Sequence, residues 1–226
     1  MSRYAYSTLD PSASTTRLMN LMPGSFDDDI DVSLETLDLA NDDGREYEAL
    51  SYAWGSKDNP LEIYITDPST NIKACLPVTR DLALALRYLR LPQLSRMLWI
   101  DAICIDQENL EERGHQVKKM GDVYHTARKV IIWLGPASDD SGIAVRSLQE
   151  ISAMIEVDWN TGTMRPKTRA DANWANTQLP WMWDDKTSES VENLLQAPWF
   201  NRLWIWQEVL LSRTAEIYVG RDICRS

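Results

Sequence analysis

The stretch Leu98–Pro136, LWIDAICIDQENLEERGHQVKKMGDVYHTARKVIIWLGP, predicts a complete strand–loop–helix–strand unit. It begins with Leu98–Ile100, an apolar run followed by Asp101, which is typical of a buried strand with a polar end. Val130–Leu134 is a second apolar and β-branched run, and Gly135 ends it. Two buried strands joined by a helix predict a right-handed parallel crossover, which is the arrangement of an α/β fold.

The segment between these strands predicts a helix that begins after Asn109. Asn109 and Glu112 have the spacing of an N-cap with a capping box, in which each side chain bonds the backbone N–H of the other residue. Apolar residues then recur at helical spacing and define the face that we expect to be buried: Val117, Met120, Tyr124 and Ala127.

The loop before this helix carries most of the polar side chains of the unit. Because ligands of parallel α/β sheets bind beyond the carboxyl ends of the strands, we interpret the loop as a candidate ligand site. Its candidate residues are Asp101, Cys104, Asp106 and Gln107. For Asp101, Asp106 and Gln107, the alternative is hydrogen bonding within the loop. Cys104 is interpreted as a buried structural thiol rather than a nucleophile, because neither histidine of the chain is placed to activate it.

Other apolar runs supply further strands of the same sheet. With Tyr47–Trp54 and Ala215–Val219, the sequence predicts an α/β fold with a largely parallel central sheet flanked by helices. Tyr52, Trp54 and Gly55 stand at the carboxyl end of the first of these strands. We therefore count these three residues as ligand-binding candidates; the alternative is a tight structural turn.

Turn residues predict two antiparallel hairpins at an edge or a flank of the sheet, one around Pro23-Gly24 and one around Asp67-Pro68. We expect residues 1–14 to be a flexible lead and residues 15–226 to be a single domain. Residues 158–186 contain four tryptophans and little periodicity. We interpret them as a long insertion that is packed in places by Trp174, Trp181 and Trp183.

Composition narrows the classes of function. The 226 residues carry a formal net charge of −11, which argues against a general nucleic-acid surface but leaves room for a local basic pocket. Three widely spaced cysteines fit neither a zinc site nor a disulfide framework and favour a reducing, cytoplasmic compartment. The sequence shows neither a signal peptide nor an apolar run of membrane-spanning length. It indicates no metal and no tightly bound cofactor.

The segment Pro198–Ser212, PWFNRLWIWQEVLLS, predicts a buried helix because it is apolar almost all the way round. Glu208 in such a helix needs a donor, a cation or a polar cavity, since burying an unpaired carboxylate costs several kcal/mol. Arg202 lies about 120° away around an ideal helix, so we expect no direct pair between these two residues. Glu208 is therefore expected near the loop Asp101–Gln107. The alternative is a structural carboxylate paired with Arg202 or Arg113.

Three long segments resemble the fungal heterokaryon incompatibility (HET) domain, in the same order along the chain. They are YEALSYAWG from Tyr47, LWIDAICIDQENLEERGHQVKKMGDVYHTARKVIIWLG from Leu98, and APWFNRLWIWQEVLL from Ala197. The resemblance covers roughly residues 17–220. The chain departs from the family at Asp106, where asparagine is common, and at Trp206, where a smaller apolar residue is common.

The resemblance implies a trigger of heterokaryon incompatibility and programmed cell death, which acts in the cytoplasm as a self-associating signalling module with protein partners. HET domains are also thought to be distant relatives of TIR domains, which have a flavodoxin-like core and a helix with a Trp-Cys-x-x-Glu-like motif. The segment Trp204–Glu208 occupies the corresponding place. Some TIR domains hydrolyse NAD with that glutamate. The alternative function is therefore an NAD glycohydrolase with Glu208 as the catalytic residue, NAD as the substrate, and Arg202 and the loop residues as ligand contacts.

Overall fold

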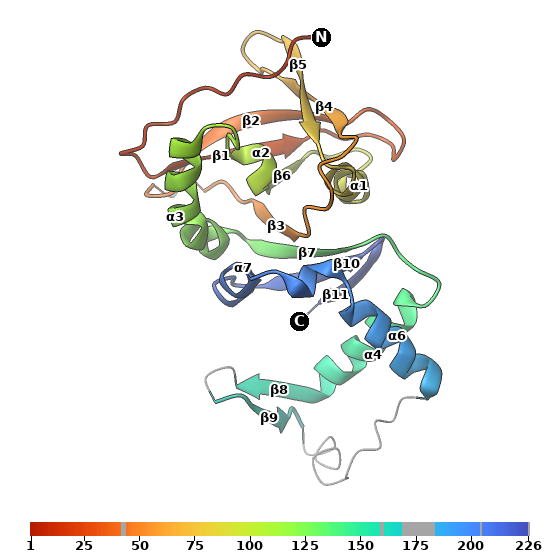
Figure 1. Ribbon diagram of the computed structural model, residues 1–226. Helices are drawn as coiled ribbons and strands as arrows, with labels where there is room; N and C mark the ends of the chain where they lie inside the picture. The colour runs from red at the N-terminus through yellow and green to blue at the C-terminus, as the bar shows by residue number, and fades with distance from the viewer. Residues whose placement is uncertain (42–43, 159–160, 169–183, 204, 226) are drawn as a thin grey trace.

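The computed structural model describes residues 1–41, 44–158, 161–168, 184–203 and 205–225, and it centres on one large sheet (Figure 1). This nine-stranded sheet has the order β11-β10-β7-β3-β6-β1-β2-β4-β5, and β8 and β9 form a separate two-stranded ribbon. The strands are β1 Thr15–Leu21, β2 Asp31–Asp38, β3 Glu48–Tyr52, β4 Leu61–Thr66, β5 Lys73–Val78, β6 Arg96–Trp99, β7 Lys129–Gly135, β8 Ile155–Asp158, β9 Thr163–Pro166, β10 Ala215–Val219 and β11 Asp222–Arg225.

The centre of the sheet is parallel, as the sequence predicts. Strand β3 pairs with β6 on one side and with β7 on the other, and β10 pairs with β7. Strands β6 and β7 therefore run in the same direction with β3 between them. Outside this centre, β1 pairs antiparallel with β6 and β2, β5 pairs antiparallel with β4, and β11 pairs antiparallel with β10. The sheet as a whole is mixed, so the prediction of a largely parallel sheet is wrong beyond its central strands.

Both predicted hairpins form, and β4–β5 lies at one edge of the sheet as expected. The hairpin β1–β2 lies inside the sheet between β6 and β4, so the prediction of an edge or flank position is wrong for it. Strand β11, which the sequence analysis missed, forms the other edge. Gly220 makes the turn into β11 with a φ of +59°, and a Cβ atom there would lie 2.8 Å from the backbone nitrogen of Ala137. A residue with a side chain would therefore strain this turn.

Helices α1 (Arg80–Leu89), α2 (Asp101–Cys104) and α3 (Leu110–Thr126) follow the central part of the chain. The side chain of Asn109 caps α3 by accepting from the backbone N–H of Glu112, as expected. The second half of the capping box is absent, because the Glu112 carboxylate accepts from Asp106 and Arg17 instead. Glu112 is buried, whereas Val117 is 38% exposed and is therefore not part of the buried face of α3.

The buried face of α3 still includes most of the expected positions. Met120, Tyr124 and the C-cap Ala127 are buried, as predicted. Gln116 and Val123, which the apolar pattern did not include, are buried as well. The hydroxyl of Tyr124 donates to the carbonyl of Leu50 at 3.2 Å. Helix α3 is thereby fixed against β3, which ends at the candidate residue Tyr52, two residues before Trp54.

After β7 the chain forms helix α4 (Ser141–Met154), and Ile155 then begins β8. Helix α6 (Asp185–Leu195) packs with α4 in a small second core. Trp174, Trp181 and Trp183, expected to pack the insertion, lie outside the described residues.

The segment Pro198–Ser212 is not one helix. A 3-10 turn, η2 (Pro198–Asn201), is followed by an extended residue, Arg202, with φ −84° and ψ 138°, and then by α7 (Ile205–Leu210). This break places Arg202 and Glu208 on different elements. The expected separation of 120° around one helix therefore does not apply to them.

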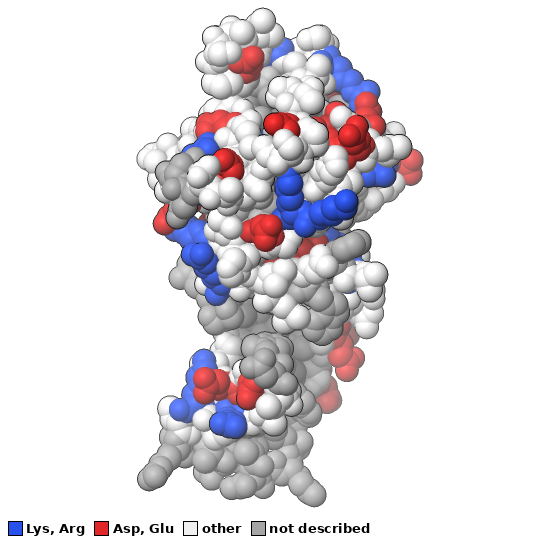
Figure 2. Space-filling model, turned by 90° about the vertical axis from the view of Figure 1, so that its left-hand side faces the viewer, with Lys and Arg blue, Asp and Glu red and all other residues white. Residues whose placement is uncertain are grey.

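The distribution of charge and the hydropathy of the helices agree with the expectations from composition. Acidic and basic side chains are interspersed on the face that Figure 2 shows, with no single basic field among the residues described there. None of the helices in the described ranges is long and apolar enough to span a membrane. The segment expected to be a flexible lead makes contacts: the backbone of Tyr4 bonds that of Cys75, and the hydroxyl of Tyr6 donates to Ile103.

Candidate functional site

A fully buried carboxylate lies where α7 meets β3. Glu208 has no exposed surface, and its two oxygens accept from Arg202 at 2.9 and 2.7 Å. The hydroxyl of Ser51 on β3 donates to Glu208 and accepts from the indole of Trp199 at 2.6 Å. The result is a closed polar cluster in an otherwise apolar surrounding.

The direct pair between Arg202 and Glu208 contradicts the expectation that these residues do not meet. The extended backbone at Arg202 turns its guanidinium back onto α7, which a continuous helix does not allow. The pair satisfies the need of a buried carboxylate for a cation. The structural alternative for Glu208 is thus partly realised, with Arg202 and not Arg113 as the partner.

Asp101 lies near this cluster as the first residue of α2. One of its oxygens accepts from the backbone N–H of Ala102 at 2.7 Å, and the other accepts from the indole of Trp54 at 3.0 Å. Burial, together with the negative charge of Glu208, raises the pKa of Asp101 to about 6 against the opposing effect of these bonds and of Arg202. Asp101 therefore changes its charge close to neutral pH.

Tyr52 lies near the charged groups of Asp101, Arg202 and Glu208 and also lines a cavity. Its side chain is almost completely buried, and its hydroxyl has no hydrogen-bond partner among the described residues. Burial raises the pKa of Tyr52 well above its ordinary value, and the negative charge of Asp101 adds to that shift. A buried hydroxyl without a partner is uncommon in proteins and is a candidate contact for a ligand.

A cavity of about 760 Å³ opens beside Tyr52 and Trp54. Its other walls come from the N-terminal segment, the β5–α1 region and the loop after α2, and they include Arg3, Tyr6, Lys57, Asp106, Gln107 and Glu108. The volume falls within the range of small-molecule sites. Glu208 and Arg202 are not among the lining residues, so Glu208 contacts a molecule in this cavity only if side chains rearrange.

Two of the remaining candidates have structural roles. Cys104 is buried, and burial raises the pKa of its thiol to about 12, so the thiol is not an activated nucleophile. Gly55 has a φ of +67°, and a Cβ atom there would lie 1.8 Å from a carboxylate oxygen of Asp81. The close approach of Asp81 accounts for this glycine without a ligand.

Asp106 and Gln107 combine both interpretations. Asp106 accepts from the backbone of Glu108 at 3.1 Å, and Gln107 donates to the carbonyl of Asp101 at 2.8 Å. These bonds lie within the loop, as the alternative held. Both side chains also line the cavity, so the loop bonds fix their positions at its wall.

Sequence reasoning missed Ser51, Trp199 and the pair of Arg17 with Glu112. Ser51 lies in a strand that is buried on both faces, so alternation of polar and apolar residues gives no signal for it. Arg17 bonds both oxygens of Glu112 at 2.6 and 3.0 Å across 95 residues of chain. A contact over that separation leaves no local pattern.

Comparison with known proteins adds a family to this geometry. A family model described as Heterokaryon incompatibility protein (HET) matches residues 47–208, a range that contains Ser51, Asp101 and Glu208. Heterokaryon incompatibility protein 6, OR allele, of Neurospora crassa is 32% identical over an alignment of 223 positions, which covers 89% of this chain and 32% of that protein. The chain thus spans about a third of the length of that relative. No solved structure matches significantly.

Proposed function

Because the chain belongs to the heterokaryon incompatibility (HET) family, we propose that it acts in fungal heterokaryon incompatibility, where it triggers programmed cell death after incompatible cells fuse. The supporting observation is the match over residues 47–208 together with a relative that is named for heterokaryon incompatibility. We further propose that it works in the cytoplasm as a self-associating module. The resemblance to TIR domains inferred from the sequence motivates this step, because TIR signalling generally depends on association.

Controlled expression in a fungal host tests this proposal. The chain is expressed from an inducible promoter, either alone or fused to a domain that dimerises on addition of a small molecule. We expect cell death to rise with expression and to rise further when the dimeriser is added. Survival of all cultures at high expression would contradict the trigger role. Equal killing by an obligate monomer and an obligate dimer would contradict the association step.

The cluster around Glu208 is the part of the domain that we propose carries this function. It brings together a buried ion pair, a carboxyl group that titrates near neutral pH and a buried hydroxyl without a partner. Perturbed titratable groups beside a cavity are typical of functional sites. The aromatic side chains of Tyr52 and Trp54 link this cluster to the cavity at the end of β3.

A second candidate is a TIR-like NAD glycohydrolase that uses Glu208. The observation in its favour is the cavity beside Tyr52 and Trp54, which has the volume of a small-molecule site. In this reaction the bond between nicotinamide and ribose breaks, water adds to the ribose carbon, and nicotinamide leaves. A carboxylate stabilises the positive charge that develops on the sugar. Because Glu208 is sealed by Arg202, substrate binding would have to open that pair.

Incubation of purified protein with NAD tests the second candidate. The products are separated by chromatography at low and at high protein concentration. Release of nicotinamide in proportion to enzyme, and its loss in Glu208→Gln, would support catalysis. If no NAD is consumed at the protein concentration at which dimerisation kills cells, only the signalling role remains.

A further inference from the structure

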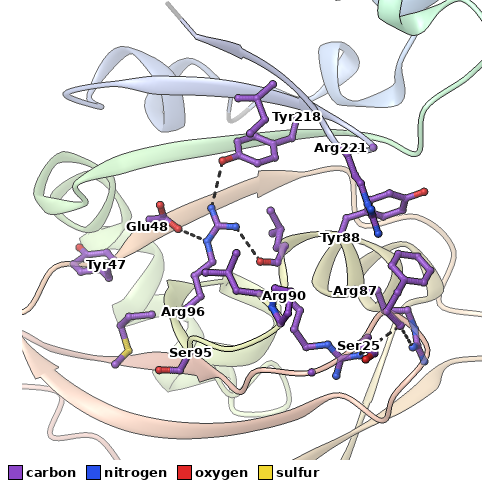
Figure 3. A pocket seen from close by; sticks show the side chains of 18 of the residues that line it. Ser25, Tyr47, Glu48, Arg87, Tyr88, Arg90, Ser95, Arg96, Tyr218 and Arg221 are labelled. Carbon is purple, nitrogen blue, oxygen red and sulfur yellow. Dashed lines mark hydrogen bonds and ion pairs between the residues drawn. The ribbon is translucent and has the colours of Figure 1, made fainter.

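A second cavity of about 840 Å³ lies beside the last turn of α1 and shares no lining residue with the cavity at the end of β3 (Figure 3). Its walls come from the β1–β2 loop, α1, the first residues of β3 and β6, and the turn between β10 and β11. Five arginines line it: Arg87, Arg90, Arg96, Arg128 and Arg221. Glu46 and Glu48 are its acidic residues, so the cavity is basic within a chain of net charge −11.

Two of the arginines are neutralised by these glutamates. Arg96 pairs with Glu48, and its guanidinium also donates to the hydroxyl of Tyr218 at 3.4 Å. Arg128 approaches Glu48 at 3.1 Å and Glu46 at 3.8 Å. The positive charge of the cavity is therefore concentrated on the other three arginines.

Arg87 and Arg90 have no carboxylate partner among the described residues. Both donate to backbone carbonyls of the β1–β2 loop, and these acceptors are uncharged. Arg90 is only 7% exposed, and its buried Nε atom has no hydrogen-bond partner in the described part of the chain. A buried guanidinium whose charge has no carboxylate partner is costly, and a nearby anion would offset that cost.

The electrostatics agree with the geometry. Burial lowers the pKa of Arg90, and the neighbouring positive charge of Arg87 lowers it further. The nearby carboxylates of Asp28, Asp31 and Asp29 act in the opposite direction, and of these Asp31 is itself paired with Lys73. An anion between Arg87 and Arg90 would relieve their repulsion.

Arg221 completes the group from the turn between β10 and β11. It is exposed in the turn after Gly220 and makes no hydrogen bond or ion pair with any described residue. Figure 3 shows Arg221, Tyr88 and Arg87 on the same side of the cavity. The ring of Tyr88 meets that of Phe26 edge-on at 5.0 Å, and both residues line the cavity. Two aromatic side chains thus lie next to unneutralised guanidinium groups.

We propose that this cavity binds a nucleotide-class ligand, with its phosphate held by Arg87, Arg90 and Arg221 and its base against Tyr88 and Phe26. The planar fork of a guanidinium matches the oxygens of a phosphate, and aromatic rings stack on bases. The volume accommodates a molecule of that size. The inference is independent of the function proposed for the Glu208 cluster.

Calorimetric titration of the full chain with AMP, inorganic phosphate and adenosine tests the proposal. We expect AMP to bind at least about tenfold more tightly than either fragment, and higher salt to weaken it. Arg221→Gln, which breaks no contact in the fold, should weaken AMP binding about tenfold. Arg213→Gln is the matched control at an exposed arginine outside the cavity, and Trp54→Leu is the control in the other cavity. Both should leave the affinity within about twofold.

Four results would overturn the assignment. They are the absence of AMP binding at millimolar concentration, equal affinity for AMP and inorganic phosphate, equal losses in Arg221→Gln and Arg213→Gln, and abolition of binding by Trp54→Leu. Because the readout is binding and not cell death, failure here is distinct from failure of the signalling role.

Discussion

The fold contains a buried pair of Arg17 with Glu112 and another of Arg202 with Glu208, and their surroundings differ. Arg17 bonds Glu112 and also donates to the carbonyls of Cys104 at 3.0 Å and Ser7 at 2.5 Å, while Glu112 also accepts from the backbone N–H of Asp106 at 2.9 Å. The additional bonds of the Arg17–Glu112 pair therefore go to backbone groups, and they fix the N-terminal segment and the loop after α2.

Arg202 and Glu208 make no such backbone contacts among the described residues. Their further partner is the side chain of Ser51, and their surroundings include Asp101, which titrates near neutral pH, and Tyr52, whose hydroxyl is unpartnered. The same type of ion pair thus has a different role in each of the two clusters. Where its bonds fix loops it is structural, and where it leaves polar groups unmatched beside a cavity we propose that it is functional.

The largest expected effect comes from removing one arginine. Arg202→Met and Arg17→Met each leave a buried carboxylate without its cation, so each should lower the free energy of unfolding by about 3–5 kcal/mol. Urea denaturation followed by circular dichroism measures the loss. Stability of either variant within 1 kcal/mol of the wild type, as a rough limit, would show that its pair is not buried as described.

Removing both members of a pair should separate the two clusters. Arg202→Met with Glu208→Met should recover most of the loss, because Ser51 keeps its bond from Trp199. Arg17→Met with Glu112→Met should not recover, since several buried backbone groups lose a partner at about 1–3 kcal/mol each. If the two double variants behave alike, the distinction between the clusters fails.

The next effect is the pH dependence from Asp101. Because its pKa is raised from 3.8 to about 6 in the folded protein, the folded state holds this proton more tightly, and stability falls as pH rises through that window. The whole contribution is at most about 3 kcal/mol, since Asp101 keeps some solvent contact. The stability difference between wild type and Asp101→Asn should therefore become less favourable to the wild type from pH 5 to pH 7.5. A constant difference would remove Asp101 as a titrating group.

A smaller effect of opposite sign is expected at Tyr52. Tyr52→Phe removes a buried hydroxyl that has no partner, so the variant should be as stable as the wild type or more stable by up to about 1 kcal/mol. The matched control is Tyr47→Phe, which removes a bond from the Tyr47 hydroxyl to the carbonyl of Val123 at 2.6 Å. That control should lose about 1 kcal/mol. Thermal unfolding of both variants measures the difference, and a destabilised Tyr52→Phe would mean that the hydroxyl has a partner.

The same comparison shows how far sequence reasoning reaches. The central strands, both hairpins, the cap at Asn109 and the proximity of Glu208 to Asp101 follow from local patterns: apolar runs, turn residues and a carboxylate that needs a partner. The pairs of Arg17 with Glu112 and of Arg202 with Glu208 do not follow. The first joins residues far apart in sequence, and the second depends on a break in a segment whose composition is helical throughout.

The mixed character of the sheet has a related cause. Strands β1 and β2 carry the apolar residues of a buried strand in either direction, and only the short connection between them shows that they are antiparallel. Which strand β1 then joins is a contact with β6 at long range. Sequence periodicity identifies strands but does not place a hairpin inside a sheet.

The central claim is that the Glu208 cluster carries the function and the Glu112 cluster carries the fold. The most direct test is to express the variants Glu208→Gln and Glu112→Gln in fungal cells and to score cell death. Limited proteolysis of the same cultures measures the amount of folded protein, and cell death is divided by that amount. Both variants make the same substitution in a buried arginine pair, so general destabilisation is matched. Tyr52→Phe, which is not expected to unfold, extends the test if Glu208→Gln does not accumulate.

We predict that Glu208→Gln is folded and does not kill, that Tyr52→Phe kills less than the wild type, and that Glu112→Gln kills as the wild type does per folded molecule. Killing by folded Glu208→Gln at the level of the wild type, or full killing by Tyr52→Phe where Glu208→Gln is absent, would contradict the claim.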